Sequence, residues 1–171
     1  MLPVKFSAVC TVCATLAFAA PASAQLRPMV YAETTVDTTP TEAFADWVSD
    51  ERIEDFFAAE ATIEAKPGGL YHLCFAPDAP AGSCGNDAGR ILGLQEGHML
   101  AFTWAMPPYM PDIRPHLTSV QILFEPVGAS QTRVRLFHTG FGEGEAWNEG
   151  RTYFAKTWPQ VLESYRVDVA G

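Results

Sequence analysis

The sequence predicts an α+β fold in which one antiparallel sheet packs against a long C-terminal helix. Short segments with alternating apolar and polar residues recur through most of the chain, turn-like segments separate them, and apolar residues near the C-terminus follow a helical period. The short connections favour antiparallel strands, because parallel strands need long crossover connections. One helix cannot cover a flat sheet of this width, so we expect the sheet to curve around the helix.

The first strand and two short helices open the predicted domain. The segment "MVYAETTVD" alternates as a half-buried strand does. Thr39 can cap the helix that follows, with Pro40 at its first position and Glu42 placed for a capping box. The segment "SDERIEDFF" predicts a second short helix, with Ile53 and two phenylalanines facing inward.

Strands fill the middle of the chain, and a helix fills its end. Six segments read as further strands: "ATIEA", "GGLYHLCF", "AGRILGL", "GHMLAFTWAM", "HLTSVQILFEP" and "TRVRLFHTGF". From Glu145 to Tyr165, apolar residues fall on one helical stripe, which predicts a long helix. Pro159 lies inside this stripe and removes one backbone donor.

Residues 1–24 have the layout of a secretory signal peptide. A single lysine precedes an apolar run over 6–20, and Ala22-Ser23-Ala24 fits a small-x-small cleavage site. A membrane anchor is the alternative, but the run is shorter than the roughly 20 apolar residues that a spanning helix needs. We therefore expect cleavage after Ala24, one domain over 25–171 without a membrane span, and a periplasmic or secreted location.

The charge balance argues against two classes of partner. The chain has 11 basic and 20 acidic residues; beyond the signal peptide, 10 basic and 20 acidic residues give a formal charge of −10. No segment concentrates Lys and Arg, as binding to nucleic acid or to an anionic membrane surface requires. We expect neither partner, and the sequence identifies no protein partner.

Cys74 and Cys84 flank the loop-like segment "FAPDAPAGS". In an oxidising compartment we expect a disulfide between them, which would stabilise the fold by about 2–3 kcal/mol. Two free thiols or two metal ligands are the alternatives. Two cysteines alone make a poor zinc site, which usually has four ligands.

Five segments in order carry a family resemblance: "TPTEAFADWVSDE", "KPGGLYHL", "GRILGLQEGHMLAFTW", "TRVRLFHTGF" and "YFAKTWPQVLESY". Together they resemble the START-like helix-grip (SRPBCC) superfamily, and more narrowly the bacterial proteins similar to the activator of heat-shock-protein-90 ATPase. The resemblance implies a helix-grip fold, a curved antiparallel sheet of about seven strands around the C-terminal helix, with a cavity between them. It also implies roles that range from carriers of small apolar ligands to cyclases, dehydratases and a cochaperone domain. The signal peptide and the cysteine pair depart from the family pattern, and export argues against the cytoplasmic cochaperone role.

Alternation within the strands predicts which side chains face the helix. Our candidate ligand-binding lining consists of the residues on that face and their helical counterparts: Tyr71, Leu73, Phe102, Trp104, Val120, Ile122, Phe124, Leu136, His138, Phe154, Trp158 and Leu162. Phe75 shares the face of Tyr71 and Leu73. The same set also describes a packed core, which leaves little empty space. Polar tips at the strand ends favour a cavity for an apolar or aromatic ligand.

His138 has three possible roles: a hydrogen-bonded core or lining residue, a group that orients a ligand, or a general base. No Ser or Cys nucleophile and no paired carboxylates accompany it, so we assign no catalytic residue. The histidines are spaced by 26, 18 and 22 residues, which matches no metal motif. The glycine-rich "GFGEGEAWNEG" lacks the lysine of a phosphate cradle. We therefore expect no metal and no cofactor.

Three functions remain open from the sequence. The first is an exported protein that binds a small apolar molecule between sheet and helix without transforming it. The second is a cyclase-, dehydratase- or hydrolase-type enzyme that uses His138 and Tyr71 as acid and base. The third is a cochaperone-like interaction module of the cell envelope, which would use the proline-rich "WAMPPYMPDIRP". That segment could also edge the pocket, or be only a stiff loop.

Overall fold

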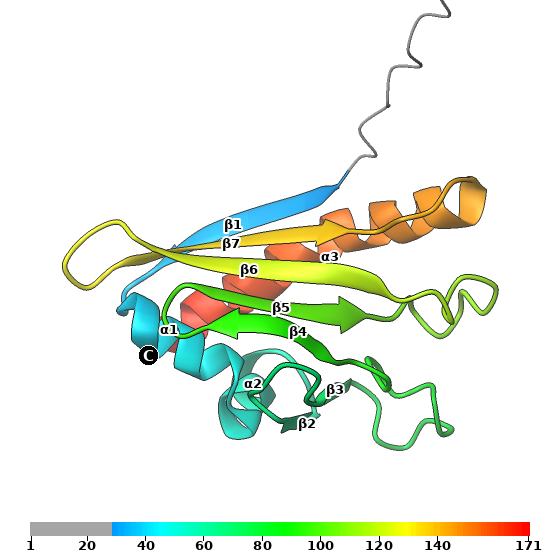
Figure 1. Cartoon of the computed structure of the whole chain (residues 1–171), viewed down its shortest axis with the longest axis horizontal. Coiled ribbons are helices and arrows are strands. Elements are labelled where there is room, and N and C mark those ends of the chain that lie inside the picture. Colours follow the sequence, from blue (N-terminus) through cyan, green and yellow to red (C-terminus); the bar gives the residue numbers. More distant parts are fainter. Residues whose placement is uncertain (1–28) are drawn as a thin grey trace, which may run out of the picture.

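The fold was obtained as a computed structural model that describes residues 29–171 (Figure 1). The predicted signal peptide lies outside the described residues. The expected order of one strand, two short helices, six strands and one long helix is confirmed. The elements are β1 (Val30–Val36), α1 (Pro40–Trp47), α2 (Asp50–Phe56), β2 (Glu60–Ile63), β3 (Tyr71–Cys74), β4 (Ile91–Gln95), β5 (Met99–Trp104), β6 (Thr118–Pro126), β7 (Thr132–Thr139) and α3 (Glu145–Ala170).

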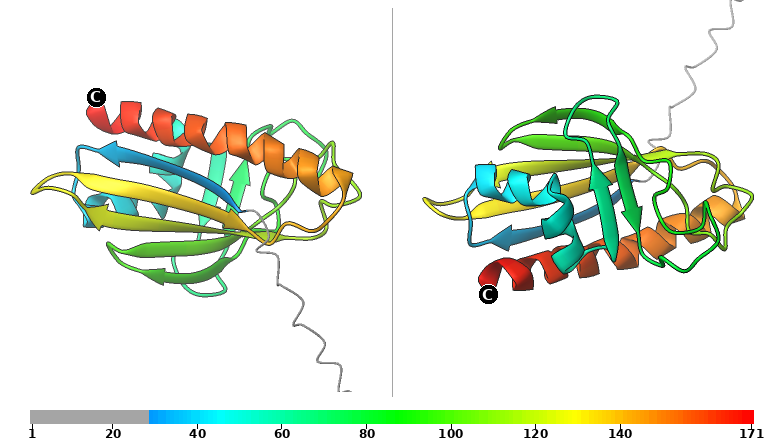
Figure 2. Two further views of the ribbon diagram at one scale, coloured as in Figure 1. Left: turned by 90° about the horizontal axis from the view of Figure 1, so that it is seen from above. Right: turned by 90° about the horizontal axis from the view of Figure 1, so that it is seen from below.

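Five strands form one antiparallel sheet in the order β1-β7-β6-β5-β4, and β2 pairs with β3 in a second sheet. The helix α3 runs along one face of the larger sheet, and α1 and α2 lie near the C-terminal end of that helix (Figure 1 and Figure 2). This arrangement is the α+β helix-grip fold that the sequence predicts.

The seven strands do not form one continuous sheet, which corrects the sequence-based expectation. Between β3 and β4 only isolated bridges occur, at Leu70 with Arg90 and at Cys74 with Gly85. The buried side chain of Asn86 adds a link of its own: its Nδ2 donates to the carbonyls of Tyr71 on β3 and Thr103 on β5, both at 3.0 Å. A side-chain amide therefore ties β3 to the larger sheet.

Strand alternation places the core correctly. The inward residues of β5, β6 and β7 are all buried, and so are those of α3 that the helical stripe predicts from Phe154 to Tyr165. Across the sheet, His138 pairs with Val30 on β1 and with Val120 on β6. The imidazole therefore belongs to a central strand, with neighbours on both sides.

The start of α1 follows the predicted capping pattern. Thr39 is the N-cap, its hydroxyl accepts from the Glu42 amide, and the Glu42 carboxylate accepts from the Thr39 amide at 3.1 Å. Pro40 occupies the first helical position, where no donor is lost. At the other end of the chain, α3 extends beyond the predicted Tyr165 to Ala170 and contains Pro159.

Candidate ligand-binding cavity

A half-open cavity of about 430 Å³ lies where the N-terminal half of α3 faces two loops. These loops, 75–90 and 105–117, gather at the same end of the molecule as that half of α3 (Figure 1). The helix contributes one face of its surface to the cavity wall: Tyr153, Phe154, Thr157, Trp158 and Val161.

The two loops supply the opposite wall. The first loop contributes Phe75, Ala76, Ser83, Cys84 and Gly85. The end of β5 and the second loop, which carries the proline-rich segment, contribute Trp104, Ala105, Met106, Pro107, Pro108, Tyr109 and Arg114, and Phe57 completes the lining. The proline-rich segment therefore edges the cavity, one of the three roles that the sequence left open.

Aromatic rings dominate the inner end of the cavity. The rings of Phe57 and Trp104 stack at 5.7 Å, and Phe75 lies 5.4 Å from Phe57. Trp104 also meets Trp158 of α3 at 5.1 Å. Offset and tilted ring pairs of this kind bury large apolar area, and a flat apolar molecule can extend the same packing. Phe75 is 43% exposed although it lines the cavity, as expected of a residue at an open mouth.

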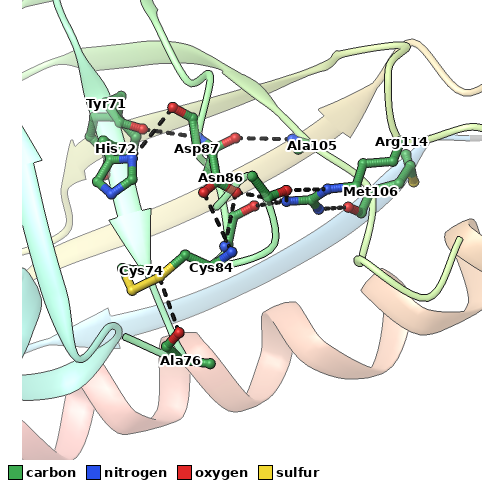
Figure 3. Close-up of polar contacts among 12 residues, drawn as sticks. Tyr71, His72, Cys74, Ala76, Cys84, Asn86, Asp87, Ala105, Met106 and Arg114 are labelled. Carbon is green, nitrogen blue, oxygen red and sulfur yellow. Dashed lines mark hydrogen bonds and ion pairs between the residues drawn. A yellow bond between two sulfur atoms is a disulfide. The ribbon is translucent and has the colours of Figure 1, made fainter. Parts of the chain in front are cut away.

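Arg114 fastens the two loops to each other (Figure 3). Its guanidinium donates to the carbonyls of Gly82 and Gly85 at 2.9 and 2.8 Å, to the carbonyl of Met106, and to the Asp87 carboxylate at 2.7 Å. The rigid fork of arginine suits such a set of planar acceptors. The charge of Arg114 is thus neutralised within the protein, although the residue lines the cavity.

A disulfide closes the first loop, as predicted. It joins Cys74, at the end of β3, to Cys84 in the cavity wall (Figure 3). Next to it, Asn86 accepts from the Ala105 amide at 3.0 Å and so connects the first loop to the start of the second. The disulfide, Asn86 and Arg114 together fix the loop wall against the sheet.

Three of the twelve predicted lining residues reach this cavity: Trp104, Phe154 and Trp158. The other nine lie in the packed core and are not among the residues that line it: Tyr71, Leu73, Phe102, Val120, Ile122, Phe124, Leu136, His138 and Leu162. Alternation identifies which side chains face inward, but not which of them border empty space instead of other side chains. In the middle of the sheet α3 packs directly on the strands, and this cavity opens where the loops replace strands.

His138 is a buried residue with partners on both ring nitrogens. The indole Nε1 of Trp158 donates to His138 Nδ1 at 3.0 Å, which leaves the ring proton on Nε2. That proton points to Thr118 Oγ1 at 2.7 Å, and the Thr118 hydroxyl donates to the Trp104 carbonyl at 2.8 Å. Burial lowers the pKa of His138 to about 3, so the ring is neutral. The imidazole therefore positions the tryptophans of the cavity wall and does not itself touch the cavity.

Tyr71 is equally unsuited to act on a ligand there. Its side chain is fully buried, and its hydroxyl donates to the Trp47 carbonyl at 3.1 Å. Burial raises the pKa of this phenol well above its ordinary value. The pair of His138 and Tyr71 therefore presents no free acid or base to the cavity.

Most of the cavity wall comes from loop residues outside the twelve predicted ones, Arg114 and Ser83 among them. Periodicity carries no information in loops, and the signal that the sequence did offer was the length and proline content of the second loop, which contains Arg114. Within residues 29–171, no group of three or more His, Cys, Asp or Glu side chains is placed to hold a metal ion. In the same part of the chain, no helix has both the length and the apolar character needed to cross a bilayer.

Comparison with known families gives a match over most of the chain. The profile described as "Activator of Hsp90 ATPase homolog 1-like protein" matches residues 37–166. The chain belongs to this family. No curated protein matches the sequence.

Solved structures of this activator-like family and its neighbours share the fold. A protein from Mesorhizobium loti is 17% identical, with a TM-score of 0.66 over 84% of this chain and 96% of its own. One from Staphylococcus saprophyticus is 17% identical, with a TM-score of 0.63 over 84% and 92%. An HSP90 activator from Plasmodium falciparum is 19% identical, with a TM-score of 0.64 over 83% and 96%. At these identities the likeness shows a common fold and no more.

Proposed function

We propose that this chain is an exported helix-grip protein that binds a small apolar or aromatic molecule in the cavity between α3 and the two loops, without transforming it. The observation that supports this function is the aromatic, half-open cavity of about 430 Å³. Its one charged lining residue, Arg114, already has its acceptors within the protein. Ligand pockets are typically concave, largely apolar and supplied with few polar groups.

Catalysis is not part of this proposal because the candidate acid and base are engaged elsewhere. His138 and Tyr71 lie in the core, and each polar atom of their rings has a partner there. A general base must reach the proton that it removes.

Binding of the neutral dye N-phenyl-1-naphthylamine tests the proposal. We expect its fluorescence to rise on addition of the protein, and Ala76→Trp, which fills the mouth from the first loop, to weaken binding at least about tenfold by steric exclusion. Ala81→Trp is the matched control, since Ala81 is exposed in the same loop and does not line the cavity. Equal affinity of the two variants would rule out this cavity as the binding site.

The family name supports a second candidate, a cochaperone-like interaction module. Export from the cytoplasm, which we propose from the N-terminal sequence, would separate the protein from a cytoplasmic chaperone. A simple assay distinguishes the two functions. The protein is added to a purified Hsp90-type ATPase, and the rate of ATP hydrolysis is measured. Our proposal predicts an unchanged ATPase rate, and stimulation would favour the second candidate.

A further inference from the structure

An outer groove on α3, which contains one basic and one acidic residue, adjoins the apolar cavity. The groove is lined by Tyr109, Glu149, Thr152, Tyr153, Lys156 and Thr157. Three of these residues, Tyr109, Tyr153 and Thr157, also line the inner cavity. The two hollows therefore adjoin at these three residues, so one elongated molecule that passes them would reach both.

Polarity changes at the boundary between the hollows. The inner end is walled by Phe57, Trp104 and Trp158, and no carboxylate lines it. At the boundary the rings of Tyr109 and Tyr153 meet edge to face at 6.1 Å, and both residues are partly exposed. Burial, Tyr153 and Glu149 raise the pKa of Tyr109, so its hydroxyl remains a donor at neutral pH. The groove thus adds two charged side chains that are not in the lining of the inner cavity, Glu149 and Lys156.

Lys156 is a free cation in this groove. It is exposed, and it has no ion pair or hydrogen bond to any residue within 29–171. In sequence it precedes Thr157, which lines both hollows, and it follows Tyr153 by about one helical turn. Glu149, the other charged residue of the groove, lines only the groove, as Lys156 does, and lies about one turn to the other side of Tyr153. Of these two residues, only Lys156 has a chain neighbour, Thr157, that lines both hollows, so the lysine lies beside the place where the hollows meet.

Building on the proposed function, we propose that the ligand is amphipathic, with an aromatic or apolar body in the inner cavity and a carboxylate-type head in the outer groove beside Lys156. The ammonium of Lys156 and the phenol hydroxyls of the two tyrosines supply donors to that head. Hydrogen bonds between charged groups are shorter and stronger than neutral ones, and here they would also fix the direction in which the ligand enters.

Displacement of N-phenyl-1-naphthylamine by three compounds tests this assignment. All three contain the same naphthalene ring: 1-naphthaleneacetate is anionic, 1-naphthaleneacetamide is neutral and 1-naphthylmethylammonium is cationic. At low salt we expect the acetate to bind about two- to fivefold more tightly than the amide, the range for a partly exposed ion pair. Lys156→Gln should abolish this preference. Lys66→Gln is the matched control, because it removes the same charge from an exposed lysine that lines neither hollow. In 1 M NaCl the preference of the unaltered protein should shrink through screening.

Two results would overturn the assignment while leaving the proposed function intact. One is a preference for the acetate that survives Lys156→Gln. The other is tightest binding of the ammonium compound, lost on Glu149→Gln, which would place a cationic head in the groove. If neither the neutral dye nor any naphthalene compound binds, the proposed function fails together with this inference, so the two failures are distinguishable.

Discussion

At the scale of single residues, the main result concerns His138, which holds the cavity wall in place from behind. Its Nδ1 accepts the indole proton of Trp158, and its Nε2 proton reaches Thr118. Thr118 in turn binds the carbonyl of Trp104. Both tryptophans line the cavity, so a chain of buried hydrogen bonds joins the two sides of the aromatic wall. Removal of any group from this hydrogen-bond chain would leave a buried neighbour without its partner.

Thr118→Val tests this hydrogen-bond chain. Valine has nearly the shape of threonine but leaves His138 Nε2 and the Trp104 carbonyl without their buried partner. We expect the free energy of unfolding to fall by about 1–3 kcal/mol in urea denaturation. Thr35→Val on β1 is the control: Thr35 is exposed, and its substitution should change stability by less than about 0.5 kcal/mol. A Thr118→Val protein as stable as the control would contradict the assigned network.

The depressed pKa of His138 predicts a pH dependence of stability. In the folded protein, burial lowers the pKa of the His138 imidazole from 6.5 to about 3. Between these two pH values the unfolded chain therefore binds a proton at His138 that the folded protein does not bind. Acidification therefore favours unfolding throughout this window, by about 1.4 kcal/mol per pH unit. Between pH 7.5 and 5, the unaltered protein should lose about 2 kcal/mol more stability than His138→Gln.

The comparison of His138→Gln with the unaltered protein uses the change in the free energy of unfolding with pH. It does not use the absolute stability, which His138→Gln lowers at every pH. His98→Gln removes an exposed histidine and should keep the pH dependence of the unaltered protein. The NMR signals of the His138 ring should stay constant over the same range. A ring that titrates near pH 6 would show that it is not sealed in the core.

At the scale of elements, helices, strands and the two loops followed from the sequence, whereas the contacts that join the loops into a cavity wall did not. The capping box at Thr39 and Glu42 could be read directly, because its bonds connect residues three apart. The link between the two cavity loops could not, because Arg114 lies 32 residues from Gly82 and 27 from Asp87. Contacts of that range depend on how the sheet brings the loops together.

Arg114→Lys is the element-scale test. A lysine keeps the charge but cannot satisfy the carbonyls and the carboxylate with one planar fork. We expect amide hydrogen exchange to accelerate about three- to tenfold in loops 75–90 and 105–117, since each factor of ten corresponds to about 1.4 kcal/mol of lost local stability. Exchange within β6 and β7 should be unchanged and serves as the internal control. Unaltered loop exchange would mean that the disulfide and Asn86 alone fix the wall.

At the scale of the whole molecule, export and the disulfide belong to one prediction. The predicted cleavage site after Ala24 would release a domain whose two remaining cysteines form the bond between Cys74 and Cys84. Disulfides persist in oxidising compartments and are rare in the cytosol. The closed loop carries part of the cavity wall, so the location of the protein and the shape of its site are coupled.

Expression of the full chain in a Gram-negative host tests this coupling. We expect the protein in the periplasm, with the intact mass of an oxidised chain that begins at Gln25. Replacement of Ala24 by glutamate should block cleavage at that site while the mature sequence stays the same. Protein that remains in the cytoplasm with its N-terminus uncut would exclude export.

The double variant Cys74→Ala/Cys84→Ala tests the contribution of the disulfide to stability. It should unfold at a lower urea concentration, with a loss of about 2–3 kcal/mol in the free energy of unfolding.

The sequence by itself determined the α+β class, the order of the elements, the inward faces of β3, β5, β6 and β7, the cap of α1 and the cysteine pair. All of these depend on residues that are neighbours in the chain or on a fixed period. Tertiary structure decided which inward residues meet empty space: Trp104, Phe154 and Trp158 line the cavity, whereas His138 and Tyr71 pack behind it. The reason is physical, because a cavity is the gap left where packing ends, and that point is set by loops whose long-range contacts have no period in the sequence.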